Sequence, residues 1–79
     1  MDIKEVANRF NTYAELVRVH GGQAAEVTAY VPTMQEAFLV VQNGTKLEEE
    51  PQTWVVYELT DGKIKLTFDP SMALTAEII

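Results

Sequence analysis

The chain has 79 residues and a mass of 8.9 kDa, which is enough for one small domain and excludes a two-lobed enzyme with an interdomain cleft. Its 47% hydrophobic and 23% charged residues are typical of a folded protein rather than a disordered one. Twelve acidic against six basic residues give a net charge of −6, which disfavours direct contact with a nucleic-acid backbone. We therefore expect residues 1–79 to form a single small domain with no direct nucleic-acid partner.

The absence of cysteine excludes disulfides, thiolate metal sites and cysteine nucleophiles. Residues 1–10 lack the basic and continuous apolar segments of a signal peptide or membrane anchor. We therefore expect a cytoplasmic protein with no membrane partner. Because a core of this size is marginal, a protein partner or a homodimer would add to its stability.

Residues 2–19 predict an amphipathic helix. Apolar side chains recur on one face of it, at Ile3, Val6, Ala7, Phe10, Tyr13, Ala14 and Val17. Asp2 is expected to cap its start, with Glu5 in the capping-box position, and Gly21-Gly22 is expected to end it. An alternative interpretation makes residues 16–20 a strand that pairs through Gly21-Gly22 with the chain that follows.

The centre of the chain combines a strand signal with an ambiguous segment. Residues 25–31 alternate between apolar and polar and predict a strand that ends at Pro32. Residues 34–42 fit a helix, because Met34, Ala37, Phe38 and Val41 have helical spacing behind a capping box formed by Thr33 and Glu36. They also fit a strand that turns back at Asn43-Gly44, the pair favoured in type I′ turns, and we favour the strand.

Leu47 to Pro51 contains three adjacent glutamates before a proline and predicts a solvated loop. Residues 54–59 and 64–68 then give the strongest hairpin signal in the chain. With Asp61 and Gly62 as the turn residues, Leu59 pairs with Ile64, and Glu58 lies across from Lys65. This register gathers the main apolar set on one face: Val55, Tyr57, Leu59, Ile64, Leu66 and Phe68.

The last segment predicts a short C-terminal helix, with Asp69 as its cap, Pro70 at its first position and an apolar stripe of Met72, Ala76 and Ile79. The predicted architecture is thus α+β. An N-terminal amphipathic helix packs on an antiparallel sheet of three to five strands in meander order, and a short helix ends the chain.

Few residues are available for catalysis or metal binding. The only histidine, His20, and the only serine, Ser71, could act together only if the fold joined opposite parts of the chain. Motifs such as HExxH, paired histidines or an Asp-x-Asp-x-Asp loop are absent, and the turn and cap roles account for Asp61 and Asp69. We therefore predict no catalytic, metal-binding or cofactor-binding residues, no cofactor and no enzymatic activity.

Trp54 and Val56 fall on the hairpin face opposite the main apolar set, and Tyr30 could join them there. Large aromatic side chains supply much of the binding energy of protein contacts, and the predicted acidic loop adds a second accessible surface. The sequence therefore predicts these partner-binding residues: Trp54, Val56, Tyr30, Glu48, Glu49 and Glu50.

The expected function is that of a small acidic protein-interaction module, such as a regulatory subunit, adaptor or inhibitor, that binds through an exposed sheet face. One alternative is an acidic decoy of the kind small phage inhibitors provide, which occupies a basic nucleic-acid-binding groove. Another is a small-ligand or catalytic domain whose pocket is completed by dimerisation, with His20 as the residue that titrates near neutral pH.

Overall fold

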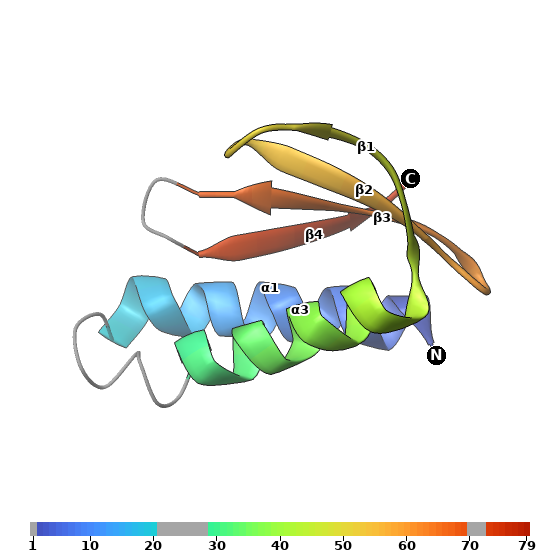
Figure 1. The fold of residues 1–79 in the computed structure, drawn as a ribbon. Helices are drawn as coiled ribbons and strands as arrows, with labels where there is room; N and C mark the ends of the chain where they lie inside the picture. Colours follow the sequence, from blue (N-terminus) through green and yellow to red (C-terminus); the bar gives the residue numbers. More distant parts are fainter. Residues whose placement is uncertain (1, 21–28, 70–72) are drawn as a thin grey trace.

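A computed structural model describes residues 2–20, 29–69 and 73–79. The described elements are α1 (Ile3–His20), α3 (Val31–Asn43), β1 (Thr45–Glu50), β2 (Trp54–Leu59), β3 (Gly62–Phe68) and β4 (Leu74–Ile78). The strands form one antiparallel sheet in the order β1-β2-β3-β4, and both helices lie against the same face of it (Figure 1). The α+β class and the N-terminal helix are confirmed.

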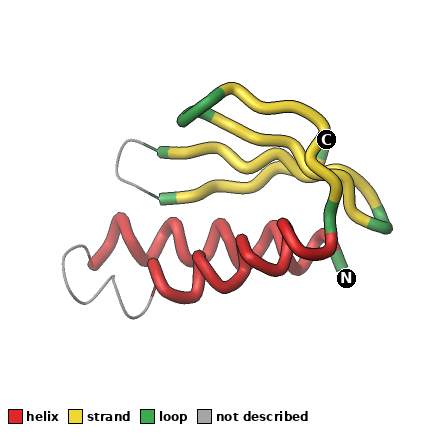
Figure 2. The backbone as a smooth tube through the Cα atoms, viewed as in Figure 1, coloured by secondary structure: helices red, strands yellow, loops and turns green. Residues whose placement is uncertain are grey.

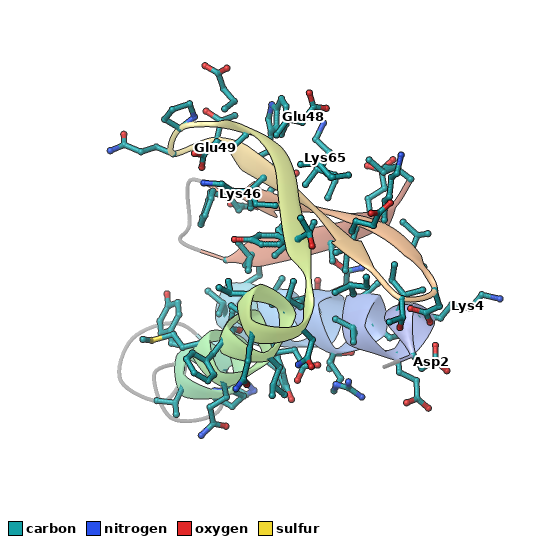
Figure 3. All side chains as sticks on the ribbon, turned by 45° about the vertical axis from the view of Figure 1, so that its right-hand side comes forward. Asp2, Lys4, Lys46, Glu48, Glu49 and Lys65 are labelled. Carbon is teal, nitrogen blue, oxygen red and sulfur yellow. The ribbon has the colours of Figure 1, made fainter. Side chains whose placement is uncertain are left out.

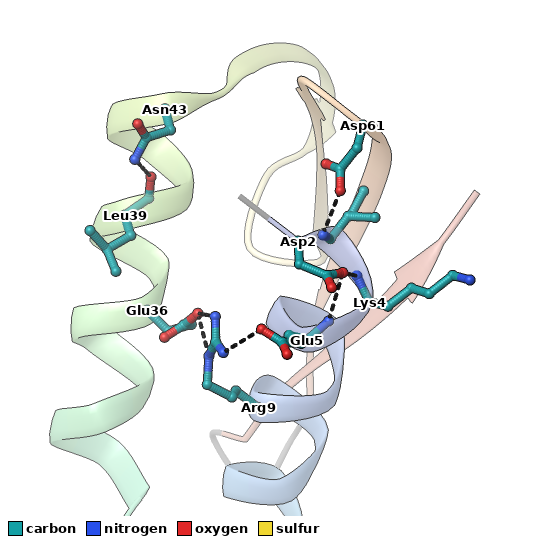
Figure 4. A network of polar contacts seen from close by, with 9 residues as sticks. Asp2, Lys4, Glu5, Arg9, Glu36, Leu39, Asn43 and Asp61 are labelled. Carbon is teal, nitrogen blue, oxygen red and sulfur yellow. Dashed lines mark hydrogen bonds and ion pairs between the residues drawn. The ribbon is translucent and has the colours of Figure 1, made fainter.

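The N-terminal helix buries the predicted face, with Val6 and Phe10 fully enclosed. Its start is capped twice (Figure 4). Asp2 Oδ1 accepts hydrogen bonds from the backbone N–H of Lys4 at 3.0 Å and of Glu5 at 3.4 Å, while Asp61 Oδ2 accepts one from Ile3 at 2.9 Å. The alternative of a strand over 16–20 is wrong, and Gly21-Gly22 lies outside the described residues.

The ambiguous segment 34–42 is part of helix α3, so the strand that we favoured there is wrong. Ala29 and Tyr30 form a wide helical turn that leads into α3, which also overturns the predicted strand at its described end. Residues 25–28 lie outside the described residues. Pro32 sits in the first turn of the helix, where its missing N–H has no helical partner to lose.

Asn43-Gly44 ends α3 and does not form a hairpin turn. The Gly44 N–H donates to the Val40 carbonyl oxygen at 2.8 Å, and Asn43 Nδ2 donates to the Leu39 carbonyl oxygen at 2.8 Å. A Cβ atom at Gly44 would lie 2.8 Å from both Leu59 Cδ2 and the Val40 carbonyl oxygen. Glycine is thus needed because the backbone passes closely between the helix end and β2.

The run of glutamates lies in an edge strand, so the predicted loop is wrong although the predicted exposure is right. All residues of β1 are exposed, and the strand is irregular at Leu47, between the paired positions Lys46 and Glu48. Charged side chains and a bulge at a sheet edge oppose pairing with a further strand. Figure 2 shows only short loops, drawn in green, between α3 and β1 and between β1 and β2.

The β2–β3 hairpin forms with a register shifted by two residues. Its turn is Thr60-Asp61, so Leu59 lies across from Gly62, and Glu58 across from Lys63 rather than Lys65. Gly62 has a φ of 152°, which residues with a Cβ rarely adopt. Side chains alternate with a period of two, so the shift leaves the whole predicted apolar set on one face.

The chain ends in strand β4, and the predicted C-terminal helix is wrong. β4 pairs along β3, with the Asp69 N–H donating to the Ala73 carbonyl oxygen at 2.8 Å before the pairing begins. Asp69 accepts a hydrogen bond from Arg18 at 3.2 Å. Residues 70–72, which include the predicted helix start, lie outside the described residues. Alternation of Leu74, Ala76 and Ile78 on one face suits a half-buried strand better than a helix.

The core lies between α1 and the inner face of the sheet. Its buried members are Ile3, Val6, Ala7, Phe10, Val40, Leu59, Ile64, Leu66 and Leu74. Asn11 ties the helix to β4 from the side, because its amide donates to the Ala76 carbonyl oxygen at 3.0 Å and accepts from the Ala76 N–H at 2.9 Å. α1 therefore covers β3 and β4, while α3 reaches β2 through its C-terminal half.

We predict that Gly44→Ala lowers the free energy of unfolding by about 2 kcal/mol, because the added methyl group has to displace the helix end or Leu59. Urea titration followed by circular dichroism measures the change. Gln42→Ala, an exposed position two residues earlier in the same helix, is the control and should change little. An equal stability of the two variants would contradict the close approach at Gly44.

Candidate functional site

The inward face of α3 carries a buried charge. Glu36 is 7% exposed, its Oε1 accepts a hydrogen bond from Arg9 Nε at 2.8 Å, and Arg9 Nη2 forms an ion pair with the same oxygen at 2.8 Å. Glu5, one turn before Arg9, lies 3.8 Å from the same guanidinium (Figure 4). The hydrogen bond to Glu36 raises the pKa of Arg9 above its ordinary value, so the guanidinium stays charged. Arg9 thus gives Glu36, the one charged residue in the α3 sequence, a partner of opposite charge.

The outward face of α3 is largely apolar, although a surface helix usually turns polar side chains outward. Its exposed apolar side chains, which we call the α3 stripe, are Met34 (71%), Phe38 (65%), Val41 (55%), Val31 (45%) and Leu39 (42%). Together with Gln35, four of these residues line a shallow apolar hollow. Because Glu36 points inward, the outward face of this fully described helix carries no charge.

The α3 stripe is large for a chain of this size. A fully exposed large side chain offers on the order of 150–200 Å², so five at the observed exposures present roughly 500 Å². Contiguous apolar patches of several hundred Å² on small proteins mark sites of interaction with proteins or membranes. The stripe is therefore the strongest candidate site on the described surface.

A second hollow lies between α3 and the inner face of the sheet, because α1 covers only the β3–β4 side. This groove has a volume of about 690 Å³. Its apolar walls come from α3 and the sheet, and its charged lining residues are Lys46, Glu49, Glu50 and Asp69. Lys46 Nζ donates to Glu49 Oε1 at 3.0 Å, and this hydrogen bond raises the pKa of Lys46. Val41 belongs to both the groove and the α3 stripe.

The outer face of the sheet carries two predicted partner-binding residues. Trp54 is partly buried, and Lys65 Nζ lies 4.7 Å from the centre of its ring, in cation–π contact. Val56 is only 3% exposed, since its cross-strand neighbours are Glu48 on one side and Lys65 on the other. A binding partner on this face would therefore contact Trp54 and charged side chains, but almost none of Val56.

The other predicted residues lie elsewhere. Tyr30 packs with the buried cluster of Ala14, Val17, Ala29 and Ala73 beside the start of α3, on the helical side of the sheet. By their pairing with β2, Glu48 and Glu50 lie on the outer side of β1 and Glu49 on the inner side, and Glu50, the last residue of the strand, also borders the groove. Figure 3 shows Glu48, Glu49 and Lys46 along this edge strand. The structure thus separates Tyr30 from Trp54 but places the glutamates on the strand next to Trp54.

Of the two potential catalytic residues, the structure describes only His20. His20 is exposed at the last position of α1, and Ser71 is not among the described residues. Within residues 2–20, 29–69 and 73–79, no cluster of three or more histidine or acidic side chains could hold a metal ion. None of the helices described is both long and apolar enough to cross a membrane.

Sequence reasoning missed the α3 stripe because it favoured a strand over 34–42. The signal was present in the helical alternative, which placed Met34, Phe38 and Val41 on one face. Treating that face as core was the natural assumption. The sequence did not show that Glu36, expected in a capping box, instead faces Arg9 and turns the apolar face outward.

In a comparison with known proteins, no protein-family model, curated protein or solved structure matches this chain.

We predict that Arg9 and Glu36 are energetically coupled. Glu36→Ala should cost about 2 kcal/mol, because it removes a charge-assisted hydrogen bond from a buried site. In a double-mutant cycle, Arg9→Ala should add little once Glu36 is gone, with a coupling of about 1 kcal/mol. Urea unfolding of the four proteins measures this.

The control for this cycle is the surface pair of Glu15 and Arg18, which lie 3.3 Å apart with both side chains exposed. Removing Glu15 should leave the unfolding midpoint nearly unchanged. Additive effects of the Arg9 and Glu36 substitutions would show that the pair does not hold α3 in place.

Proposed function

We propose that this chain is a small protein-interaction module that binds a partner protein through the α3 stripe. The observation that supports it best is the exposure of five apolar side chains on a helix face without charge. Leaving them in water is unfavourable by about 25 cal/mol for each Å² of apolar surface, and a partner that covers them recovers this free energy. The proposal requires no catalytic step, and a cytoplasmic location is part of it.

Placing the contact on α3 differs from the sheet-face contact expected from the sequence. Phe38 and Met34 project freely, whereas Trp54 already has Lys65 against its ring and Val56 is enclosed. An anchor that is exposed in the free protein and desolvated in the complex contributes most to affinity. Phe38 fits this description best, with Trp54 as a secondary contact.

An acidic decoy remains the alternative, and the edge strand is what favours it. Glu48 and Glu50 pair with Val56 and Trp54 on the same side of an ordered strand, which holds these two carboxylates in a fixed relation that a loop would not provide. Such a pair could occupy a basic groove of a nucleic-acid-binding protein. A ligand pocket completed by dimerisation is a third possibility and would use the groove between α3 and the sheet.

We predict that Phe38→Lys weakens binding to the natural partner at least about 30-fold, because it places a charge at the centre of the apolar contact. Affinity capture from the native host with mass spectrometry identifies the partner, and titration calorimetry measures the dissociation constant. Val19→Lys is the matched control, because Val19 is 67% exposed on α1 and the substitution changes the net charge equally. We expect its affinity to stay within about twofold of the wild type.

Replacing Glu48, Glu49 and Glu50 together by Gln separates the decoy from the stripe. Binding through α3 should survive this change at physiological salt, since exposed charges mainly affect association rates. If the triple variant loses binding and Phe38→Lys keeps it, the acidic edge is the site and the proposal is wrong.

A further inference from the structure

The α3 stripe has the spacing of a coiled-coil seam. Val31, Met34, Phe38 and Val41 follow one another at intervals of three, four and three residues, which is the pattern of a and d positions in a heptad. All four are exposed along one side of the described helix. The flanking positions Gln35 and Gln42 are polar and uncharged. A stripe of this shape is complementary to another helix with the same spacing.

We propose that the partner seated on the α3 stripe is a second copy of this chain, with the two α3 helices antiparallel about a twofold axis. This inference rests on the proposed function, because it names the occupant of the same surface. In this arrangement Val31 of one copy lies opposite Val41 of the other, and Met34 lies opposite Phe38. Each layer is then apolar on both sides, and the Met34–Phe38 layers add sulfur–aromatic contacts.

Charge favours a second copy at this surface. Two chains that each carry −6 repel one another unless they meet where neither presents a carboxylate. The outward face of α3 meets this condition, since Glu36 is turned inward onto Arg9. The nearest charges on β1 are those of the groove that Val41 lines, where Lys46 is already paired with Glu49.

The same charges favour antiparallel over parallel helices. Val41, at one end of the stripe, shares the groove with Glu49 and Glu50, so the acidic strand β1 lies at that end. A parallel pair would bring two acidic strands to the same end. An antiparallel pair places them at opposite ends, about 15 Å apart along ten residues of helix, and aligns the helix dipoles favourably.

The buried area is in the range of a reversible dimer. The four seam side chains present roughly 400 Å² on each copy, so the pair removes about 800 Å² from water, an area typical of weak, reversible interfaces. For an interface this small we expect a dissociation constant on the order of micromolar or weaker. The chain should therefore exchange between monomer and dimer in a concentration range that solution methods cover.

Sedimentation equilibrium of the full chain over about 1–500 μM tests whether two copies of the chain associate. We expect the mass to rise from 8.9 kDa to twice that value, and Phe38→Lys to weaken the dimer at least about 100-fold, since each copy loses an anchor. Val19→Lys should dimerise as the wild type does. Circular dichroism confirms that each variant is folded.

Disulfide trapping tests the orientation and is simple because the chain has no cysteine of its own. A mixture of Val31→Cys and Val41→Cys chains should form a mixed disulfide on mild oxidation, while either chain alone should link slowly, because the two like positions lie too far apart. Rapid linkage of Val31→Cys to itself would overturn the antiparallel arrangement.

A wild-type chain that stays monomeric throughout would overturn the second copy as the occupant. The proposed function would then still stand if a host protein is bound in a Phe38-dependent manner. A dimer that Phe38→Lys leaves intact would overturn the stripe as the dimer contact. These outcomes separate a failure of the self-association from a failure of α3 as the binding surface.

Discussion

The close approach of the backbone at Gly44 to β2 determines how α3 is oriented. The chain passes from the helix into β1 without a loop, and only a residue without Cβ fits between the Val40 carbonyl oxygen and Leu59. This contact fixes Val40 inward, where it is fully buried in the core. Because residues four apart share a helix face, Glu36 must then face inward as well. The position of Gly44 therefore sets the rotation of α3 about its axis.

The orientation of α3 accounts for both its buried charge and its exposed apolar face. A carboxylate facing inward needs a partner, and Arg9 offsets the desolvation of Glu36 with a hydrogen bond from Nε and an ion pair from Nη2. The opposite face is then left to Met34, Phe38 and Val41. A helix evolved only for stability would place these side chains in the core. Their exposure in a domain with so small a core is what we expect of a surface that a partner covers.

The sequence predicted the N-terminal helix and the apolar face of the hairpin because both depend on periodicity over many residues. The hairpin face was predicted correctly with a register shifted by two residues, since alternation is unchanged by an even shift. The errors came from short signals with two meanings. Asn43-Gly44 suits a hairpin turn and a helix end, and Asp69-Pro70 suits a helix start and a strand connection. Tertiary contacts decide each case: Gly44 packs against Leu59, and Leu74 to Ile78 pair with β3.

The hydrogen bond from the Ile3 N–H to Asp61 joins residues 58 positions apart, and Asn11 reaches Ala76 across 65. The cap of α1 therefore depends on the turn between β2 and β3, and its lateral contact through Asn11 depends on β4. Contacts of such separation require most of the chain to be ordered before they form, which slows folding relative to helical bundles of equal size. During synthesis α1 emerges before β3 and β4, so no sheet covers its apolar face until they follow. Val6 and Phe10, fully buried in the folded chain, therefore stay exposed to water and to other chains until β4 has been made.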